Sequence, residues 1–257
     1  MFVDSHCHLD RISDEVKDIE AIIERARLNK VEHMLCVAVS VREFEKMREA
    51  VSNFNNVSMS CGVHPLHQED ACDYDTLLSH ASRDDVIAVG ETGLDYHYSE
   101  ETKLVQQQSF IDHIKVANQV NKPLIIHTRA AQDDTLQILS DHYDTKTGAV
   151  LHCFTESLDM AQKALKMGLY ISISGIVTFN SAKDLQQTVK QIPLDRLLIE
   201  TDSPWLAPAP HRGKKNEPQY VVRVAEFIAD LRGISVDEVA NATKENFYRL
   251  FSRVPRI

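Results

Sequence analysis

Histidines and carboxylates follow short apolar stretches at several places in this sequence. The first such place holds His6 and His8, two residues apart behind an apolar start. In an extended strand the side chains alternate between faces, so both imidazoles would point the same way and could bind one metal ion. A pair of solvated histidines has the same spacing, so the rest of the chain decides between the two interpretations.

Comparable residues occur after later apolar stretches. They are Glu91 after 86–90, His127 after 123–126, His152 after 149–151 and Asp202 after 197–199, with His64 just past 57–62. Even without His64, the set holds four imidazoles and two carboxylates. That exceeds the about three protein ligands of one open catalytic metal, so we expect two metals that share a carboxylate. Such nitrogen and oxygen ligands suit zinc, manganese, cobalt or nickel better than calcium.

These residues need a scaffold that brings the ends of distant strands together. Short β-branched stretches alternate with longer amphipathic ones along the whole chain, which is typical of βα units around a parallel sheet. Strands are expected at 2–6, 33–39, 57–62, 86–90, 123–126, 149–151, 169–173 and 197–199. Helices are expected near 15–29, 42–53, 74–81, 101–119, 133–142, 158–167, 182–190, 220–231 and 236–251.

Eight such units predict an α/β protein with a single (β/α)₈ TIM-barrel domain over 1–257, a common length for this fold. The active site of such a barrel lies at the carboxyl ends of its strands, where the candidate ligands are expected. An open doubly wound sheet is the alternative. It is disfavoured because His6, Cys7 and His8 stand where a glycine-rich phosphate loop would follow the first strand.

Composition narrows the class of protein further. The net charge is −10, which excludes a general nucleic-acid coat protein but leaves room for a local basic patch. No stretch reaches the about 20 apolar residues that span a bilayer, and no signal peptide is evident. Of five cysteines, four lie in or beside apolar stretches and are expected to be reduced core thiols: Cys7, Cys36, Cys61 and Cys153. We therefore expect a cytoplasmic protein that does not enter membranes.

Short motifs across nearly the whole chain are similar to those of one family. They are DSHCHLD at 4–10, GVHP at 62–65, GETGLDY at 90–96, PLIIHTR at 123–129, LHCF at 151–154, ETDSPWL at 200–206, HRGK at 211–214 and NF at 246–247. In this order they resemble the TatD family of metal-dependent hydrolases and deoxyribonucleases, in particular its bacterial YcfH-like branch. The resemblance implies an amidohydrolase-like barrel with two divalent metals, whose identity among zinc, manganese, magnesium, cobalt and nickel stays open.

The resemblance also implies a role for individual residues. His6, His8 and Asp202 would bind one metal, His127 and His152 the second, and Glu91 would bridge both. Asp202 would orient or deprotonate the attacking water, which makes Asp202 and Glu91 the catalytic candidates. Substrate would lie near His64, Asp95 and Arg129, whose guanidinium can pair with a phosphate. Family members often carry an acidic residue where this chain has Ala130.

The segment after the last expected strand adds four further candidates. Arg212 and Lys214, with Lys215 less certain, form either a solvated loop or a basic rim that binds phosphate. Trp205, the single tryptophan, would either stack on a base or cover the mouth of the barrel.

The metal ligands favour hydrolysis by metal-activated water, and the resemblance implies a deoxyribonuclease that cleaves phosphodiester bonds in DNA. A 3′–5′ exonuclease acting as a monomer on single-stranded DNA or 3′ ends is the expected form. A hydrolase of a small-molecule ester, amide or phosphoester is the alternative, because one fold serves many chemistries. A noncatalytic protein with a structural metal is disfavoured, because His64 and Arg129 would then be surplus.

Overall fold

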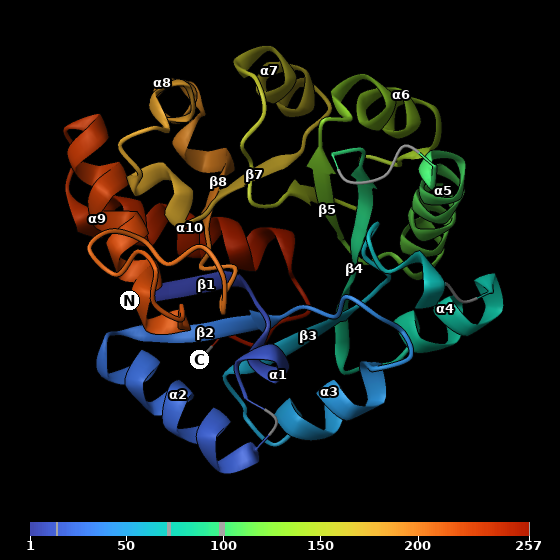
Figure 1. Ribbon diagram of the computed structural model, residues 1–257, viewed down its shortest axis with the longest axis horizontal. Helices are drawn as coiled ribbons and strands as arrows, with labels where there is room; N and C mark the ends of the chain where they lie inside the picture. The colour runs from blue at the N-terminus through green and yellow to red at the C-terminus, as the bar shows by residue number, and fades with distance from the viewer. Residues whose placement is uncertain (14, 71–72, 98–100, 257) are drawn as a thin grey trace.

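Eight parallel strands form a nearly closed barrel at the centre of the molecule, with helices around it (Figure 1). The computed structural model describes residues 1–13, 15–70, 73–97 and 101–256. The strands are β1 (Phe2–Cys7), β2 (Val31–Cys36), β3 (Val57–Cys61), β4 (Val86–Asp95), β5 (Leu124–Arg129), β6 (Ala149–Leu151), β7 (Tyr170–Ile173) and β8 (Leu197–Ile199), paired in that order. The predicted (β/α)₈ barrel is confirmed.

The α-helices lie between successive strands or after the last one. They are α1 (Leu9–Ile12), α2 (Val16–Leu28), α3 (Phe44–Val51), α4 (Tyr74–Ala81), α5 (Lys103–Val120), α6 (Gln132–His142), α7 (Leu158–Lys166), α8 (Lys183–Gln191), α9 (Val221–Arg232) and α10 (Val236–Leu250). Helix α2 shows why they pack on the barrel, because Ile19, Ile22, Ile23 and Ala26 recur at helical spacing and are all buried.

The two ends of the sheet meet between β1 and the segment that follows β8. The backbone N–H of Asp202 donates to the carbonyl oxygen of His6 (2.9 Å), and the N–H of His8 donates to that of Ser203 (2.8 Å). Beside them, the Thr201 N–H donates to the Asp4 carboxylate (2.8 Å). These contacts bring the first and last candidate ligands to the same end of the barrel.

Strands β4 and β5 are longer than predicted, and this changes the position of two candidate ligands. The sequence predicts that β4 ends at Gly90 and β5 at Ile126, but β4 continues to Asp95 and β5 to Arg129. Glu91 and His127 therefore lie within paired strands. A Cβ atom at Gly93 would come within 2.0 Å of the His127 carbonyl oxygen, so glycine is needed for this close pairing. Most other boundaries agree within a few residues, except that the short helix α1 was not predicted.

Helix α10 packs across the amino-terminal end of the barrel. Its Phe247, Tyr248 and Phe251 join the cluster formed by side chains from the barrel interior, such as Val3 and Leu198. No helix in the described part of the chain is long and apolar enough to cross a membrane.

His33 is buried under α10, between the Phe247 and Tyr248 rings and the Ser58 hydroxyl. Burial lowers the pKa of His33 from 6.5 to about 4. Protonation therefore favours the unfolded chain, and stability is lost as pH falls from 6.5 towards 4. For this one group the loss amounts to about 3 kcal/mol.

We expect His33→Gln to reduce this acid sensitivity. Urea unfolding of metal-free protein at pH 7 and pH 4 should show a loss in the free energy of unfolding that is about 3 kcal/mol smaller in the variant than in the wild type. The exposed His142→Gln should behave like the wild type. An unchanged loss in His33→Gln would contradict the buried, neutral state of His33.

Candidate metal centre

The six predicted metal ligands meet at the carboxyl end of the barrel, around the carboxylate of Glu91. Its Oε2 lies 3.4 Å from His6 Nε2 and 3.8 Å from His8 Nε2. Its Oε1 lies 2.7 Å from His152 Nε2 and 3.3 Å from His127 Nδ1. Each carboxylate oxygen thus faces a separate pair of the predicted ligand imidazoles, which is the arrangement a bridging ligand needs.

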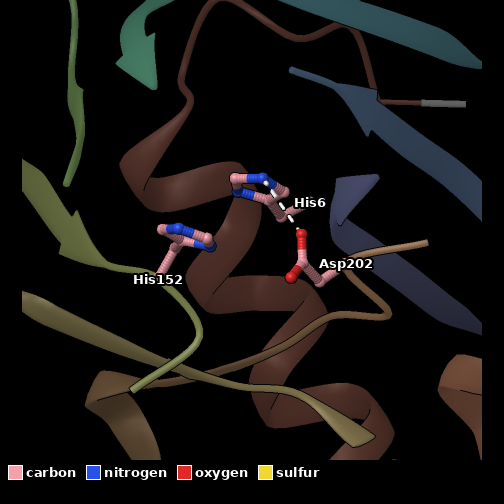
Figure 2. Close-up of side chains that lie close together, drawn as sticks. All are labelled: His6, His152 and Asp202. Carbon is pink, nitrogen blue, oxygen red and sulfur yellow. Dashed lines mark ion pairs between the residues drawn. The ribbon is translucent and has the colours of Figure 1, made fainter. Parts of the chain in front are cut away.

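Asp202 completes the group on the β1 side. Its Oδ1 lies 3.3 Å from His8 Nε2 and 3.7 Å from His6 Nε2, and these two nitrogens are 3.1 Å apart. Figure 2 shows Asp202 pointing towards His6, with His152 on the other side; the His6 and His152 rings stack with centroids 4.0 Å apart.

The donor atoms fit divalent metal ions. Ligands about 2.0–2.1 Å from a tetrahedral metal lie about 3.3 Å from one another, close to the separations seen here. The buried His152 Nε2 lies 2.7 Å from Glu91 Oε1 and can bind a metal once the imidazole gives up its proton. The Nδ1 of His8 lies 2.8 Å from the Val37 carbonyl oxygen, which can accept a hydrogen bond from the Nδ1–H group. In this tautomer Nε2 carries no proton and is available to a metal.

Burial and charge set the protonation of this group. Burial alone would raise the pKa of Glu91, but the His152 and His64 imidazoles hold it well below its usual value. Burial would lower the pKa of His152, yet the Glu91 and Glu200 carboxylates raise it well above its usual value. A metal must displace that proton from His152, so we expect its affinity to increase with pH.

His64 lies closer to the candidate ligands than the sequence predicts. Its Nε2 is 3.3 Å from Glu91 Oε1, and its ring packs edge-on against that of His127 at 4.6 Å. Its Nδ1 accepts a hydrogen bond from the Leu66 N–H, which points Nε2 at the centre. Glu91, His127 and His64 thus form a group that could itself hold a metal ion.

Glu200 is a candidate functional residue that the sequence did not reveal. Its side chain is fully buried; Oε1 accepts a hydrogen bond from the Cys153 N–H (2.7 Å) and lies 3.3 Å from His152 Nδ1. Its Oε2 has no hydrogen-bond partner within the described residues. A carboxylate that accepts a hydrogen bond from the other ring nitrogen of a ligand histidine fixes the orientation of the ring and its tautomer. The one signal in the sequence is that two acidic residues, Glu200 and Asp202, follow the last apolar stretch.

We expect Glu200→Gln to weaken metal binding at His152 about 10- to 100-fold, because the imidazole loses its charged acceptor. Titration against a chelator of known affinity would measure this change. The thermal stability of the metal-free variant should not fall, since a buried charge with an unpartnered oxygen is removed. Glu156→Gln is the matched control, because Glu156 accepts a hydrogen bond from Ala130 N–H (3.2 Å) and has no contact with His152. Equal affinity in both variants would contradict the orienting role.

A cavity of about 840 Å³ opens over the centre. Four of the predicted substrate residues line it: His64, Asp95, Arg129 and Trp205. Asp95 also contacts His127, with Oδ2 3.0 Å from Nε2. The sequence did not single out Arg11 or Leu66, which line the cavity too, nor Ile176 and Leu206, which add to an apolar wall.

Arg212 and Lys214 do not line this cavity. Both side chains are exposed, and the Arg212 guanidinium lies over the Phe179 ring, 4.4 Å from its centroid. The neighbouring Lys215 is turned towards the carbonyl oxygen of Ile12. A phosphate-binding role for these side chains therefore stays a prediction.

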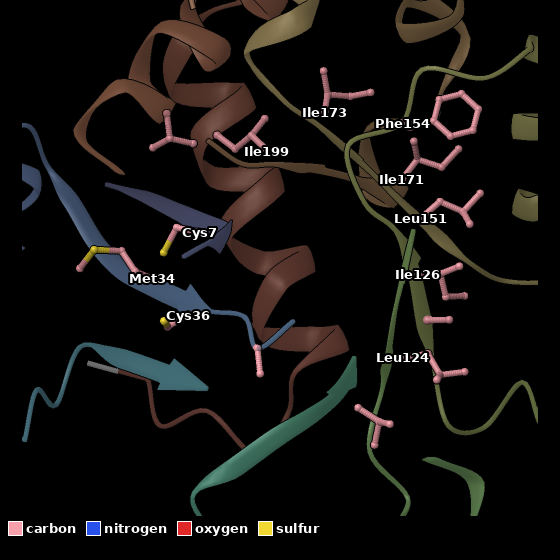
Figure 3. Packing of buried hydrophobic residues seen from close by; sticks show 14 of the residues in the cluster. Cys7, Met34, Cys36, Leu124, Ile126, Leu151, Phe154, Ile171, Ile173 and Ile199 are labelled. Atoms are coloured by element: carbon pink, nitrogen blue, oxygen red, sulfur yellow. The ribbon is translucent and has the colours of Figure 1, made fainter. Parts of the chain in front are cut away.

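No disulfide joins the cysteines that the structure describes, but the surroundings of these thiols differ. Cys7, between the two histidines of β1, is fully buried and packs with Met34 and Cys36 outside the barrel interior (Figure 3). This is the orientation expected from strand alternation. Cys153 is partly exposed and lines the cavity, whereas the sequence predicts a core thiol; Cys72 lies outside the described residues.

Backbone strain is concentrated beside the ligands. Asp202 (φ 55°), Cys153 (φ 42°) and Leu206 (φ 57°) all adopt left-handed conformations and all line the cavity. Such conformations cost non-glycine residues about 1–3 kcal/mol each and cluster at functional sites. Ala130 is also left-handed (φ 53°).

The similarity to known proteins covers both the barrel and this centre. The sequence matches the family described as TatD related DNase over residues 3–252. It is 51% identical to the metal-dependent hydrolase YcfH of Escherichia coli K12, covering 97% of this chain and 95% of that protein. It is 40% identical to the metal-dependent hydrolase YabD of Bacillus subtilis, covering 98% and 99%. The crystal structure of YJJV, a TatD homologue from Escherichia coli K12, superposes with a TM-score of 0.92 at 31% identity, covering 99% of this chain and 98% of that one.

Proposed function

The chain belongs to the TatD-related DNase family and is a metal-dependent hydrolase, and from this premise we propose that it removes nucleotides from the 3′ ends of DNA at a dinuclear metal site. The observation that carries the proposal is the position of Glu91, with one oxygen towards His6 and His8 and the other towards His127 and His152. A single carboxylate between two imidazole pairs suits two ions better than one.

We assign His6, His8 and Asp202 to the first ion, His127 and His152 to the second, and Glu91 to both. When bound, the two ions supply Lewis acidity to a phosphoryl group and make a water molecule more acidic. Metal analysis of the purified protein would identify the ions among zinc, manganese, magnesium, cobalt and nickel.

Asp202 is the proposed acceptor of the proton from the attacking water. Burial alone would raise its pKa, but the His8 and His6 imidazoles lower it, so the carboxylate is ionised at neutral pH. Its side chain is 14% exposed and lines the cavity, where a water molecule can reach it. A carboxylate in this position can both orient the water and take its proton.

The cavity wall supports DNA as the substrate. Arg129 lines it beside His127 and can pair with a phosphate through two N–H groups. Trp205 is half exposed at the mouth, edge-on to His8 at 5.2 Å, and offers a face on which an unpaired base can stack. This combination favours single strands or frayed 3′ ends. We further propose that the enzyme acts as a cytoplasmic monomer; the buried thiols of Cys7 and Cys36, which form no disulfide, support a reducing compartment.

Oligonucleotides labelled at one end test this proposal directly. Single-stranded DNA labelled at its 5′ end, given with manganese, magnesium or zinc, should shorten stepwise, while a 3′ label should be released at once as a mononucleotide. Parallel RNA and small-ester substrates define selectivity, and EDTA is the control for metal dependence. Internal cleavage, or release from the 5′ end, would contradict the proposed direction. Turnover of small esters with none of DNA would instead favour a small-molecule hydrolase.

A further inference from the structure

A second, smaller cavity lies at the opposite end of the barrel from the metal centre. It holds about 220 Å³ and is bounded by the segments that precede β5, β6, β7 and β8 and by the end of α10. Its lining includes Thr145, Gly148, Gly168 and Ser252. None of the ligands proposed above lines it, so it is separate from the reaction centre.

Four cationic side chains line this cavity: Lys146, Arg196, Arg249 and Arg253. Among the described residues that line it there is no aspartate or glutamate. Arg196 has a carboxylate nearby, that of the largely exposed Asp195 at 3.6 Å. Within the described part of the chain the other three have no carboxylate within ion-pair distance. This concentration of unpaired positive charge is unexpected in a chain of net charge −10.

Neutral groups hold the guanidinium groups in place. Arg249 donates to the Asn246 side-chain oxygen (3.0 Å), and Arg253 donates to the Val120 carbonyl oxygen (3.2 Å). Arg196 lies over the Tyr170 ring, 5.3 Å from its centroid, and donates to its neighbour's carbonyl oxygen. These contacts restrict the side chains without neutralising them, so like charges remain close together and repel.

We propose that this cavity binds a small phosphate-bearing anion. A bound anion would relieve the repulsion, and the planar guanidinium donors match the oxygens of a phosphate group. The hydroxyl groups of Thr145 and Ser252 can add further hydrogen bonds. The volume equals that of about seven water molecules at about 30 Å³ each, which suits inorganic phosphate or the phosphate end of a mononucleotide. The inference does not depend on the reaction proposed above.

Amide NMR of the full-length, metal-loaded protein tests the proposal at the site itself. Titration with inorganic phosphate, and separately with deoxyadenosine monophosphate, should shift the amide resonances of Gly148 and Gly168 saturably. Potassium chloride at equal ionic strength should not. Shifts near Thr128 and Thr155 report binding at the metal centre and are analysed separately.

Single variants link the binding to the cationic groups. Arg249→Ala and Arg253→Ala should each raise the dissociation constant at least about tenfold, because each removes a charged hydrogen-bond donor. Arg223→Ala, an exposed arginine on α9 paired with Glu226, should leave it unchanged. The proposal fails if chloride produces the same shifts, if both variants bind normally, or if a single-stranded oligonucleotide alone saturates the site.

Discussion

Replacing Glu91 by alanine should abolish hydrolysis and reduce the metal content from the proposed two ions per chain to one or none. Both carboxylate oxygens face imidazole nitrogens of the centre, so removal of the side chain takes a donor from each proposed ion. Loss of several kcal/mol of transition-state stabilisation corresponds to a fall in kcat of at least about a thousandfold. Mass spectrometric metal analysis and the end-labelled DNA assay would measure the two effects on one sample.

Glu32→Ala is a suitable control for the Glu91 variant. Glu32 is also a glutamate on a barrel strand, but it is only partly buried and pairs with Lys244 and Tyr248 at the opposite end. Its loss should cost some thermal stability and leave kcat and metal content unchanged. A Glu91→Ala protein that keeps two ions and near-normal turnover would refute the bridging role.

Replacing Asp202 by asparagine should lower kcat by about 100- to 10,000-fold, the range typical for loss of a positioned general base. The amide keeps the shape of the side chain but cannot accept the proton, and it weakens the contact with His8 Nε2 at 3.3 Å. Since Glu91, His127 and His152 remain, we expect the second ion to stay bound. Single-turnover kinetics at saturating metal would separate slower chemistry from weaker metal binding.

Asp195→Asn is the control, because Asp195 is exposed and its replacement removes the same charge from the segment that leads into β8. Its kcat should be indistinguishable from that of the wild type. Full activity of Asp202→Asn would mean that another group accepts the proton. Asp95 would then be the next candidate, because it lines the same cavity and contacts His127.

Local sequence patterns were sufficient for most of the fold. Helix α4 and strands β6 and β8 begin and end where their patterns predict, because periodicity and flanking turns are encoded within each segment. The six candidate ligands could be selected because each follows an apolar stretch, and a parallel barrel gathers such positions at one end. The predicted order of helices and strands was therefore enough to bring the six candidate ligands to one end of the barrel.

The structural features that local sequence patterns did not predict depend on tertiary contacts. Glycine and charge in the GETGLD segment indicate a loop, yet pairing with β5 keeps β4 extended to Asp95. The orientation of Glu200 towards His152 depends on how β6 and β8 meet across β7, which no local pattern encodes. Arg212 and Lys214 are near Asp202 in sequence, but they do not line the cavity that Asp202 lines.

The seam between β1 and the segment after β8 has a consequence for folding. The contact between Asp4 and Thr201 joins residues 197 positions apart, and the proposed first ion takes ligands from both sides of the same seam. Such an ion would hold together the two ends of a very long loop. Because it binds only when the seam is closed, it would oppose opening of the seam by mass action. Chelators would then do more than stop turnover: they would loosen the barrel where its ends meet, so β1 amides should exchange with solvent faster in metal-free protein than those of β5.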